Sequence, residues 1–112
     1  MANSETDVAQ VMKLKELVAY QTGAVVSRTL VGGDGGTVTA FAFDEGQELS
    51  EHTVPFDAMV LVVEGEVDIK ISSAGFRLME GETIIMPANK PHALRAVTKF
   101  KMILIMMRSK HF

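Results

Sequence analysis

Short runs of Val, Ile, Phe and Thr, cut by glycine clusters and charged turns, fill the chain from Val25 onward. Runs of this length and composition, bounded by turn residues, are typical of β-strands. We predict strands at residues 25–31, 37–43, 48–52, 58–64, 66–71, 76–79, 83–86, 92–97 and 100–108. Many short strands at regular spacing favour an all-β sandwich or barrel.

Length and composition set the domain organisation. The 112 residues are 47% hydrophobic, which is enough for one packed domain. We expect residues 1–10 to form a flexible polar tail and residues 11–112 to form a single barrel domain. Helical spacing occurs only within residues 11–20, where we predict a short helical turn with Leu14, Leu17 and Val18 packing inward.

Charge and apolar run lengths exclude some classes of partner. The net charge is −3 and there is no basic block, so we expect no nucleic acid partner. The first residues are polar, unlike a signal peptide, and no apolar run approaches the roughly 20 residues needed to span a bilayer. The absence of cysteine fits a reducing compartment. We predict a cytoplasmic protein without membrane contact.

Two predicted strands are apolar on both faces. Residues 58–63 and 102–107 are almost wholly hydrophobic, although successive side chains of a strand point to opposite sides. One side can line the interior of the barrel, and the other must also be shielded from water. We therefore predict a homodimer formed partly through these outer faces.

Two histidines stand out as candidate site residues. His52 follows Gly46 in a β context, and His92 follows Gly81 and Pro87 in another. Imidazoles at such positions can meet inside a small β-barrel and bind a metal ion. The sequence therefore predicts that His52 and His92 converge in one cavity.

The spacing of these residues resembles the two motifs of the cupin family. The first motif has glycine, five residues, His-x-His, three or four residues, glutamate, six residues and glycine. The second has glycine, five residues, Pro-x-Gly, two residues, histidine, three residues and asparagine. The matching positions are Gly46, His52, Gly65, Gly81, Pro87 and His92. The resemblance covers roughly residues 25–107 and implies a double-stranded β-helix, the RmlC-like jelly-roll barrel of a small single-domain cupin.

The metal motif is degenerate in this chain. Val54 occupies the position of the second histidine, and Ala58 or Met59 that of the glutamate. Asn89 replaces the glycine after the proline, a mild change because asparagine tolerates the left-handed conformation. Ala96 replaces the closing asparagine. Full cupin sites hold Mn, Fe, Ni or Zn with three histidines and one glutamate, of which the resemblance retains only His52 and His92.

A third metal ligand has two candidates. Asp57 precedes the family's glutamate position, and a bulge near Pro55 would be needed to turn it inward. Glu48 has the same strand parity as His52 and is the second candidate. With either carboxylate, the pair would be the metal ligands of a possible divalent transition-metal site (Zn, Mn, Fe or Ni).

The histidines also have interpretations without metal. They can be satisfied polar groups, hydrogen-bonded to each other, to Ser50 or to water. They can instead contact a small acidic or polar ligand in an apolar pocket, or act as acid and base near neutral pH. The pocket residues expected from strand parity are Val54, Ala58, Val60 and Leu94.

Two functions follow from these alternatives. The first is a small-molecule-binding barrel, with or without a weakly held divalent metal. The second is a metal-dependent oxidoreductase of dioxygenase type, or an isomerase, with His52 and His92 as metal ligands. The missing ligands favour the first, and the sequence identifies no catalytic residue.

Overall fold

The computed structural model describes residues 9–108, which form nine strands and one short 3-10 turn, η1. The elements are η1 (Leu14–Glu16), β1 (Val25–Gly33), β2 (Gly36–Phe43), β3 (Glu48–His52), β4 (Phe56–Glu64), β5 (Glu66–Ile71), β6 (Ala74–Met79), β7 (Thr83–Met86), β8 (His92–Ala96) and β9 (Phe100–Arg108). All nine predicted strands are present. Within this range no helix has the length and apolar character that a membrane crossing requires.

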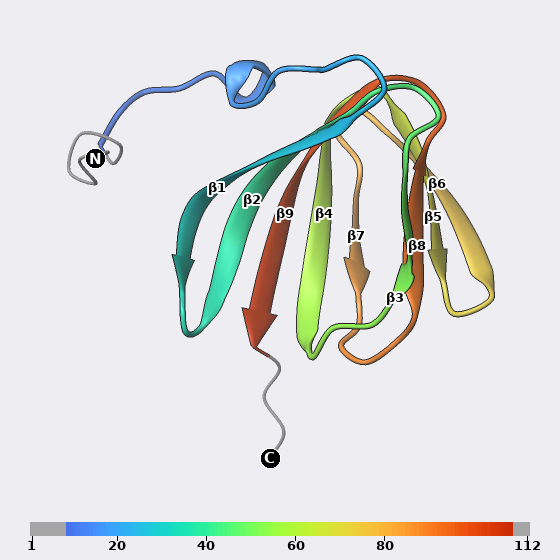
Figure 1. Cartoon of the computed structure of the whole chain (residues 1–112). Helices are drawn as coiled ribbons and strands as arrows, with labels where there is room; N and C mark the ends of the chain where they lie inside the picture. Colours follow the sequence, from blue (N-terminus) through green and yellow to red (C-terminus); the bar gives the residue numbers. More distant parts are fainter. Residues whose placement is uncertain (1–8, 109–112) are drawn as a thin grey trace.

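The strands form two antiparallel sheets that face each other (Figure 1). The five-stranded sheet has the order β1-β2-β9-β4-β7, and the four-stranded sheet has the order β3-β8-β5-β6. Strands that are distant in sequence, such as β4 and β9, are hydrogen-bonded neighbours within the five-stranded sheet. β1 and β2 extend further than predicted because the glycines of their hairpin also pair, Gly33 opposite Gly36.

The main core lies between the two sheets. It combines inward-facing residues of both, including Val60 from β4 and Ile69 from β5. The rings of Phe43 and Phe100 are fully buried in it, with centroids 4.5 Å apart. Burial of these side chains, at about 25 cal/mol per Å² of apolar surface, is the main force holding the sheets together.

A second core lies on the outer face of the five-stranded sheet. There Leu17 and Val18 cover Ala40, Ala42 and Ile103. The N-terminal segment thus shields part of the face that we expected to need cover. The prediction that Leu14 packs inward is wrong, because η1 turns its side chain outward and leaves it exposed.

The N-terminal segment is fastened to the sheet at Tyr20. The Tyr20 hydroxyl donates a hydrogen bond of 2.6 Å to Oε2 of Glu64 at the end of β4. The ammonium groups of Lys99 and Lys101 lie 5.5 and 4.8 Å from the centroid of the Tyr20 ring. Of the predicted flexible tail at residues 1–10, residues 1–8 lie outside the described part of the chain, and Ala9 and Gln10 are exposed.

The turn between β4 and β5 requires glycine. Gly65 has a φ of +84°, in the left-handed region that disfavours side chains. A Cβ at this position would also collide with the Lys99 carbonyl oxygen and with Phe100. The tight turn therefore fixes how β4 passes into the opposite sheet.

Candidate functional site

The structure brings His52 and His92 together at one end of the barrel. His52 ends β3, His92 begins β8, and the two residues are paired across these strands. Their ring centroids are 4.4 Å apart, with an edge-to-face angle of 66° between the ring planes. The two imidazoles therefore converge, as the sequence predicted.

A β-bulge in β3 makes this pairing possible. Leu49 lies opposite Leu94, while His52 lies opposite His92, so β3 has one residue more than β8 between the two pairs. Leu94 and His92 are both buried on the inner side of the barrel. Their partners Leu49 and His52 therefore also face inward, and the bulge between them makes this possible. Strict alternation would have pointed His52 outward.

Backbone carbonyls orient both rings in the same way. Nδ1 of His52 lies 2.7 Å from the Ser50 carbonyl oxygen, and Nδ1 of His92 lies 3.3 Å from that of Lys90. A carbonyl oxygen only accepts hydrogen bonds, so Nδ1 carries the proton in each ring. In a neutral imidazole, Nε2 is then a free lone pair. Each ring contributes one such acceptor to the end of the barrel.

The two histidines differ in burial. His92 is 4% exposed, whereas His52 is exposed and lies over it. Burial lowers the pKa of His92, and the neighbouring His52 ring lowers it further, while the hydrogen bond to the Lys90 carbonyl opposes the shift. His92 is therefore held as a neutral ring at the pH of a typical cell.

Two loops around the pair are fastened to each other. The Ala88 N–H donates a hydrogen bond of 2.9 Å to Oδ1 of Asp57, and the Asn89 N–H donates one of 2.8 Å to the Val54 carbonyl. Asn89 has a φ of +65°, so asparagine takes the left-handed conformation as expected. These bonds hold the loop that leads into His92.

Asp57 and Glu48 both lie away from the inner side. Ala58 is buried on the inner side of β4, so its neighbour Asp57 points outward, and the Asp57 carboxylate holds the loop at Ala88. The bulge in β3 separates Glu48 from His52 and sets Glu48 opposite Arg95 on the outer face. Among residues 9–108 no group of three potential ligands can hold a metal ion. Neither candidate joins the histidine pair.

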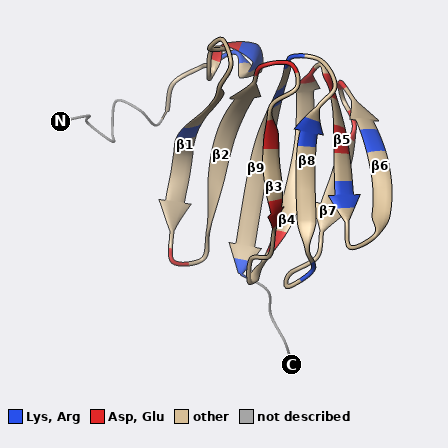
Figure 2. Cartoon of the chain, turned by 45° about the vertical axis from the view of Figure 1, so that its right-hand side comes forward, with Lys and Arg blue, Asp and Glu red and all other residues tan. Residues whose placement is uncertain are grey.

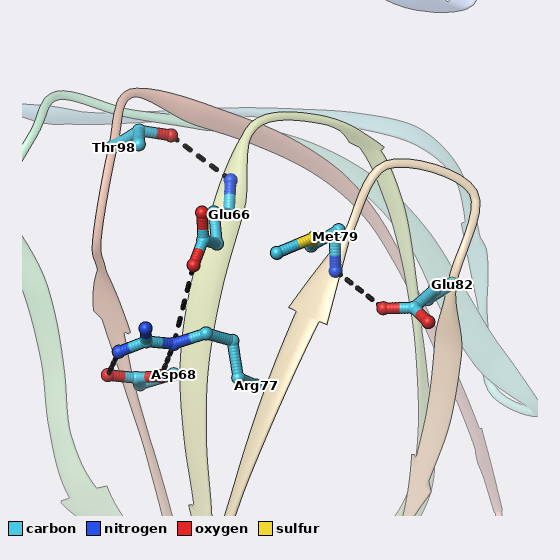
Figure 3. A network of polar contacts seen from close by, with 6 residues as sticks. All are labelled: Glu66, Asp68, Arg77, Met79, Glu82 and Thr98. Atoms are coloured by element: carbon cyan, nitrogen blue, oxygen red, sulfur yellow. Dashed lines mark hydrogen bonds and ion pairs between the residues drawn. The ribbon is translucent and has the colours of Figure 1, made fainter.

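Glu48 instead lines a groove of about 550 Å³ on the outer face of the four-stranded sheet. Its neighbours there include Asp68, Arg77 and Arg95. Arg77 donates hydrogen bonds of 2.7 and 2.9 Å to the two carboxylate oxygens of Asp68, and its Nε lies 3.4 Å from Glu66 (Figure 3). Two of the charges in the groove, those of Asp68 and Arg77, are thus already paired with each other within the chain.

The four predicted pocket residues lie at different depths. Ala58, Val60 and Leu94 are buried in the main core, which Met86 also helps to fill. Val54 is half-buried in the loop between β3 and β4, next to His52. Leu94 and His92 are both buried on the inner side of β8, so the apolar core begins beside the histidine pair.

The family is decided by comparison with known domains. The model of the cupin domain family matches residues 40–108, more than half of the chain. The chain is a cupin. The match contains both histidines and the bulged strand β3, so the site described above belongs to the cupin domain.

Solved structures agree with this assignment. This cupin is similar to a conserved protein of unknown function from Streptococcus pyogenes, with 40% identity, a TM-score of 0.86 and coverage of 92% of this chain and 90% of that one. A cupin superfamily protein from Desulfitobacterium hafniense is 26% identical, with a TM-score of 0.85 and coverage of 90% and 93%. No curated protein gives a significant match.

A third related structure belongs to a longer protein. It is a cupin 2 conserved barrel domain protein from Leptotrichia buccalis, 37% identical, with a TM-score of 0.84. The match covers 87% of this chain but 47% of that protein. The same barrel thus occurs within longer chains.

Sequence reasoning missed the two carbonyls that orient the imidazoles. Those of Ser50 and Lys90 act through the backbone, so their residue types carry no signal. The bulge was also missed, because Leu49-Ser50-Glu51-His52 reads as an ordinary alternating strand. Only the pairing with β8 reveals it.

Proposed function

We propose that this cupin binds a small molecule at the end of its barrel, with hydrogen-bond donors of the ligand directed to Nε2 of His52 and His92. The observation that carries the proposal is that Nδ1 of each ring faces a backbone carbonyl oxygen, at 2.7 and 3.3 Å. A few fixed polar groups beside apolar side chains are the usual composition of a small-ligand site, and here the two acceptors adjoin the buried Leu94.

The charge state of His92 selects the class of ligand. Its lowered pKa keeps the ring neutral, so it offers a lone pair rather than a positive charge. Hydroxyl groups and neutral N–H groups are suitable partners for such an acceptor. A carboxylate would need a protonated ring, which burial disfavours. We therefore infer a neutral ligand that carries hydroxyl or amide donors.

A divalent metal fits this donor set poorly. Two imidazoles suit Zn, Mn, Fe or Ni, but catalytic sites usually have at least three protein ligands. Val54 and Ala58 stand where the family motif has ligands, and Asp57 holds the loop at Ala88. An ion held by the two histidines and water would be weakly bound. The alternative, a metal-dependent oxidoreductase or isomerase, therefore has less support.

Thermal-shift measurements with a panel of neutral polyols, sugars and amides test the proposal, with matched carboxylates for comparison. A ligand that binds only the folded state raises the melting temperature according to its concentration and affinity. We expect neutral compounds to stabilise the wild type, and this shift to disappear in His52→Ala and His92→Gln. Arg95→Gln is the matched control, because Arg95 lies on β8 but faces outward.

Two results would count against the proposal. One is a panel in which no neutral compound gives a shift that depends on the histidines. The other is stoichiometric transition metal in wild-type protein purified without added metal, lost in a His52→Ala, His92→Ala double variant. That second result would support the enzyme instead.

A further inference from the structure

The outer face of the four-stranded sheet carries a row of charged side chains that runs across its strands. Glu48 on β3 lies opposite Arg95 on β8, and Arg95 lies opposite Asp68 on β5. Asp68 in turn lies opposite Arg77 on β6. Directly opposed residues of antiparallel strands point to the same face, so these side chains stand next to one another. Figure 2 shows this sheet with blue bands on β8, β5 and β6 and red bands on β3 and β5.

The next row along the sheet has little side-chain volume. Lys70 on β5 lies between Ala93 on β8 and Gly75 on β6. Because alanine and glycine are small, a hollow remains on each side of Lys70, and the charged row forms its wall. This hollow is the groove of about 550 Å³, which Ser73 of the turn between β5 and β6 also lines. Its volume is in the range of small-molecule sites.

Positive charge predominates among the side chains that line this groove. Lys70, Arg77 and Arg95 stand against two carboxylates, those of Glu48 and Asp68, although the whole chain has a net charge of −3. Arg77 is held by both oxygens of Asp68, at 2.7 and 2.9 Å. Lys70 and Arg95 form no ion pair with any residue of the described range 9–108. Two cations in the groove are therefore available to a ligand.

Lys70 and Arg95 are placed so that both can contact one anionic group. Arg95 is two residues from Ala93, the partner of Lys70, and such diagonal neighbours have Cα atoms about 7–8 Å apart. Both side chains are long and exposed. The pKa of Asp68 is lowered mainly by the hydrogen bonds from Arg77 and further by the charge of Arg95. The Arg95 charge thus acts inside the groove.

We propose that this groove binds the phosphate monoester of a small hydroxylated molecule, with the phosphate group between Lys70 and Arg95. A phosphate monoester carries up to about two negative charges at neutral pH, and the two available cations match them. The Arg95 guanidinium can donate two parallel hydrogen bonds to the phosphate, while the Lys70 ammonium supplies a point charge. The rest of the ligand lies over Ala93 and Gly75.

Glu48 favours the ester over a bare phosphate ion. Its carboxylate lies opposite Arg95, where it repels free phosphate but accepts a hydrogen bond from a hydroxyl group of the ligand. The groove is also separate from the histidine pair, because Ala93 and Arg95 alternate along β8 with the inward-facing His92 and Leu94. The result at one site therefore does not decide the other.

Titration of the isotope-labelled full chain with glycerol phosphate, followed by amide chemical shifts at constant ionic strength, tests the proposal. We expect saturable shifts on β5, on β8 and at Ser73. Lys70→Gln and Arg95→Gln should each weaken binding about tenfold, because each removes a hydrogen bond between charged groups. Lys13→Gln is the matched control and should keep the wild-type affinity, because Lys13 is an exposed lysine on the side of the other sheet.

Two further probes separate the parts of the ligand. Glycerol, which lacks the charge, should give no shifts in the groove. Inorganic phosphate should bind about fivefold more weakly than glycerol phosphate, and Glu48→Ala should remove this preference. The substituted side chains are all exposed, so each variant should keep the amide spectrum of the folded protein.

Three results would overturn the proposal. The first is equal affinity for glycerol phosphate in the wild type and in Lys70→Gln and Arg95→Gln. The second is a set of shifts that spreads over both sheets without saturation, because it would show only a general attraction of anions to surface charge. The third is equal binding of inorganic phosphate and glycerol phosphate by the wild type, because the groove would then not recognise an ester.

Discussion

His52 faces His92 because β3 contains one more residue than β8 between this pair and the pair formed by Leu49 and Leu94. The bulge turns the last residue of β3 inward and leaves Glu48 outside. It also places the Ser50 carbonyl oxygen 2.7 Å from Nδ1 of His52. One irregularity of the backbone thus decides which side chains meet at the end of the barrel and which nitrogen each presents.

The protein should become less stable as the pH is lowered, because folding disfavours the protonated form of His92. Its pKa is lowered from 6.5, so the unfolded chain binds a proton more readily than the folded one. The stabilisation is fully present above the unfolded pKa and is lost as pH falls through the folded pKa. Urea unfolding at about pH 7.5 and about pH 5.5, on either side of the ordinary histidine value, should show a less stable protein at the lower pH. His92→Gln should reduce that difference.

Controls separate His92 from other titrating groups. The pKa values of Asp44 and Asp68 are lowered from 3.8, so their contribution is lost mainly below the range tested. Arg95→Gln changes the outer face of the same strand and should keep the full pH dependence. If His92→Gln kept the same pH dependence of unfolding free energy as the wild type, burial of the His92 ring would not be its cause.

The sequence was sufficient for most of the fold and for half of the site. Strand positions follow from local patterns of Val, Ile, Phe and Thr, which do not depend on distant contacts. The convergence of His52 and His92 followed from turn spacing. The placement of Glu48 could not be predicted, because parity counts assume an unbroken ladder and the bulge exists only through pairing with β8. The same limit applied to Leu14, whose direction depends on how η1 crosses the sheet.

Asp57 should stabilise the loop before His92 without binding metal. Its Oδ1 accepts a hydrogen bond of 2.9 Å from the Ala88 N–H, so Asp57→Ala should cost about 1 kcal/mol of unfolding free energy. Asp57→Asn keeps an oxygen acceptor and should recover most of that loss. Urea unfolding measures both. Zinc titration should give the same affinity for wild type and Asp57→Asn, and a large loss of zinc affinity in the latter would make Asp57 a ligand after all.

Tyr20 should ionise at a higher pH than free tyrosine. Burial raises its pKa above the ordinary 10.0, and the hydrogen bond to Glu64 and the charge of that carboxylate raise it further. Tyr20 is the single tyrosine and there is no tryptophan, so ultraviolet absorbance follows this phenol alone. Glu64→Gln should lower the pKa part of the way back, since burial remains. The folded protein favours the neutral phenol. The stabilisation that this gives is present below the pKa of Tyr20 in the unfolded chain and is lost as the pH rises through its pKa in the folded protein. If the Tyr20 pKa were the same in the wild type and in Glu64→Gln, the contact between Tyr20 and Glu64 would be excluded.

Gly65 should tolerate substitution much less than Gly75. An alanine at 65 must adopt a φ of +84° and would place its Cβ against the Lys99 carbonyl and Phe100, so Gly65→Ala should cost about 2 kcal/mol or more. At Gly75, on β6, no heavy atom lies within 4 Å of an added Cβ, and the change should stay within about 0.5 kcal/mol. Chemical unfolding of the two variants side by side gives the comparison. Similar losses at both positions would mean that the turn between β4 and β5 relaxes around a side chain, and that the conformation of Gly65 does not fix the passage of the chain between the sheets.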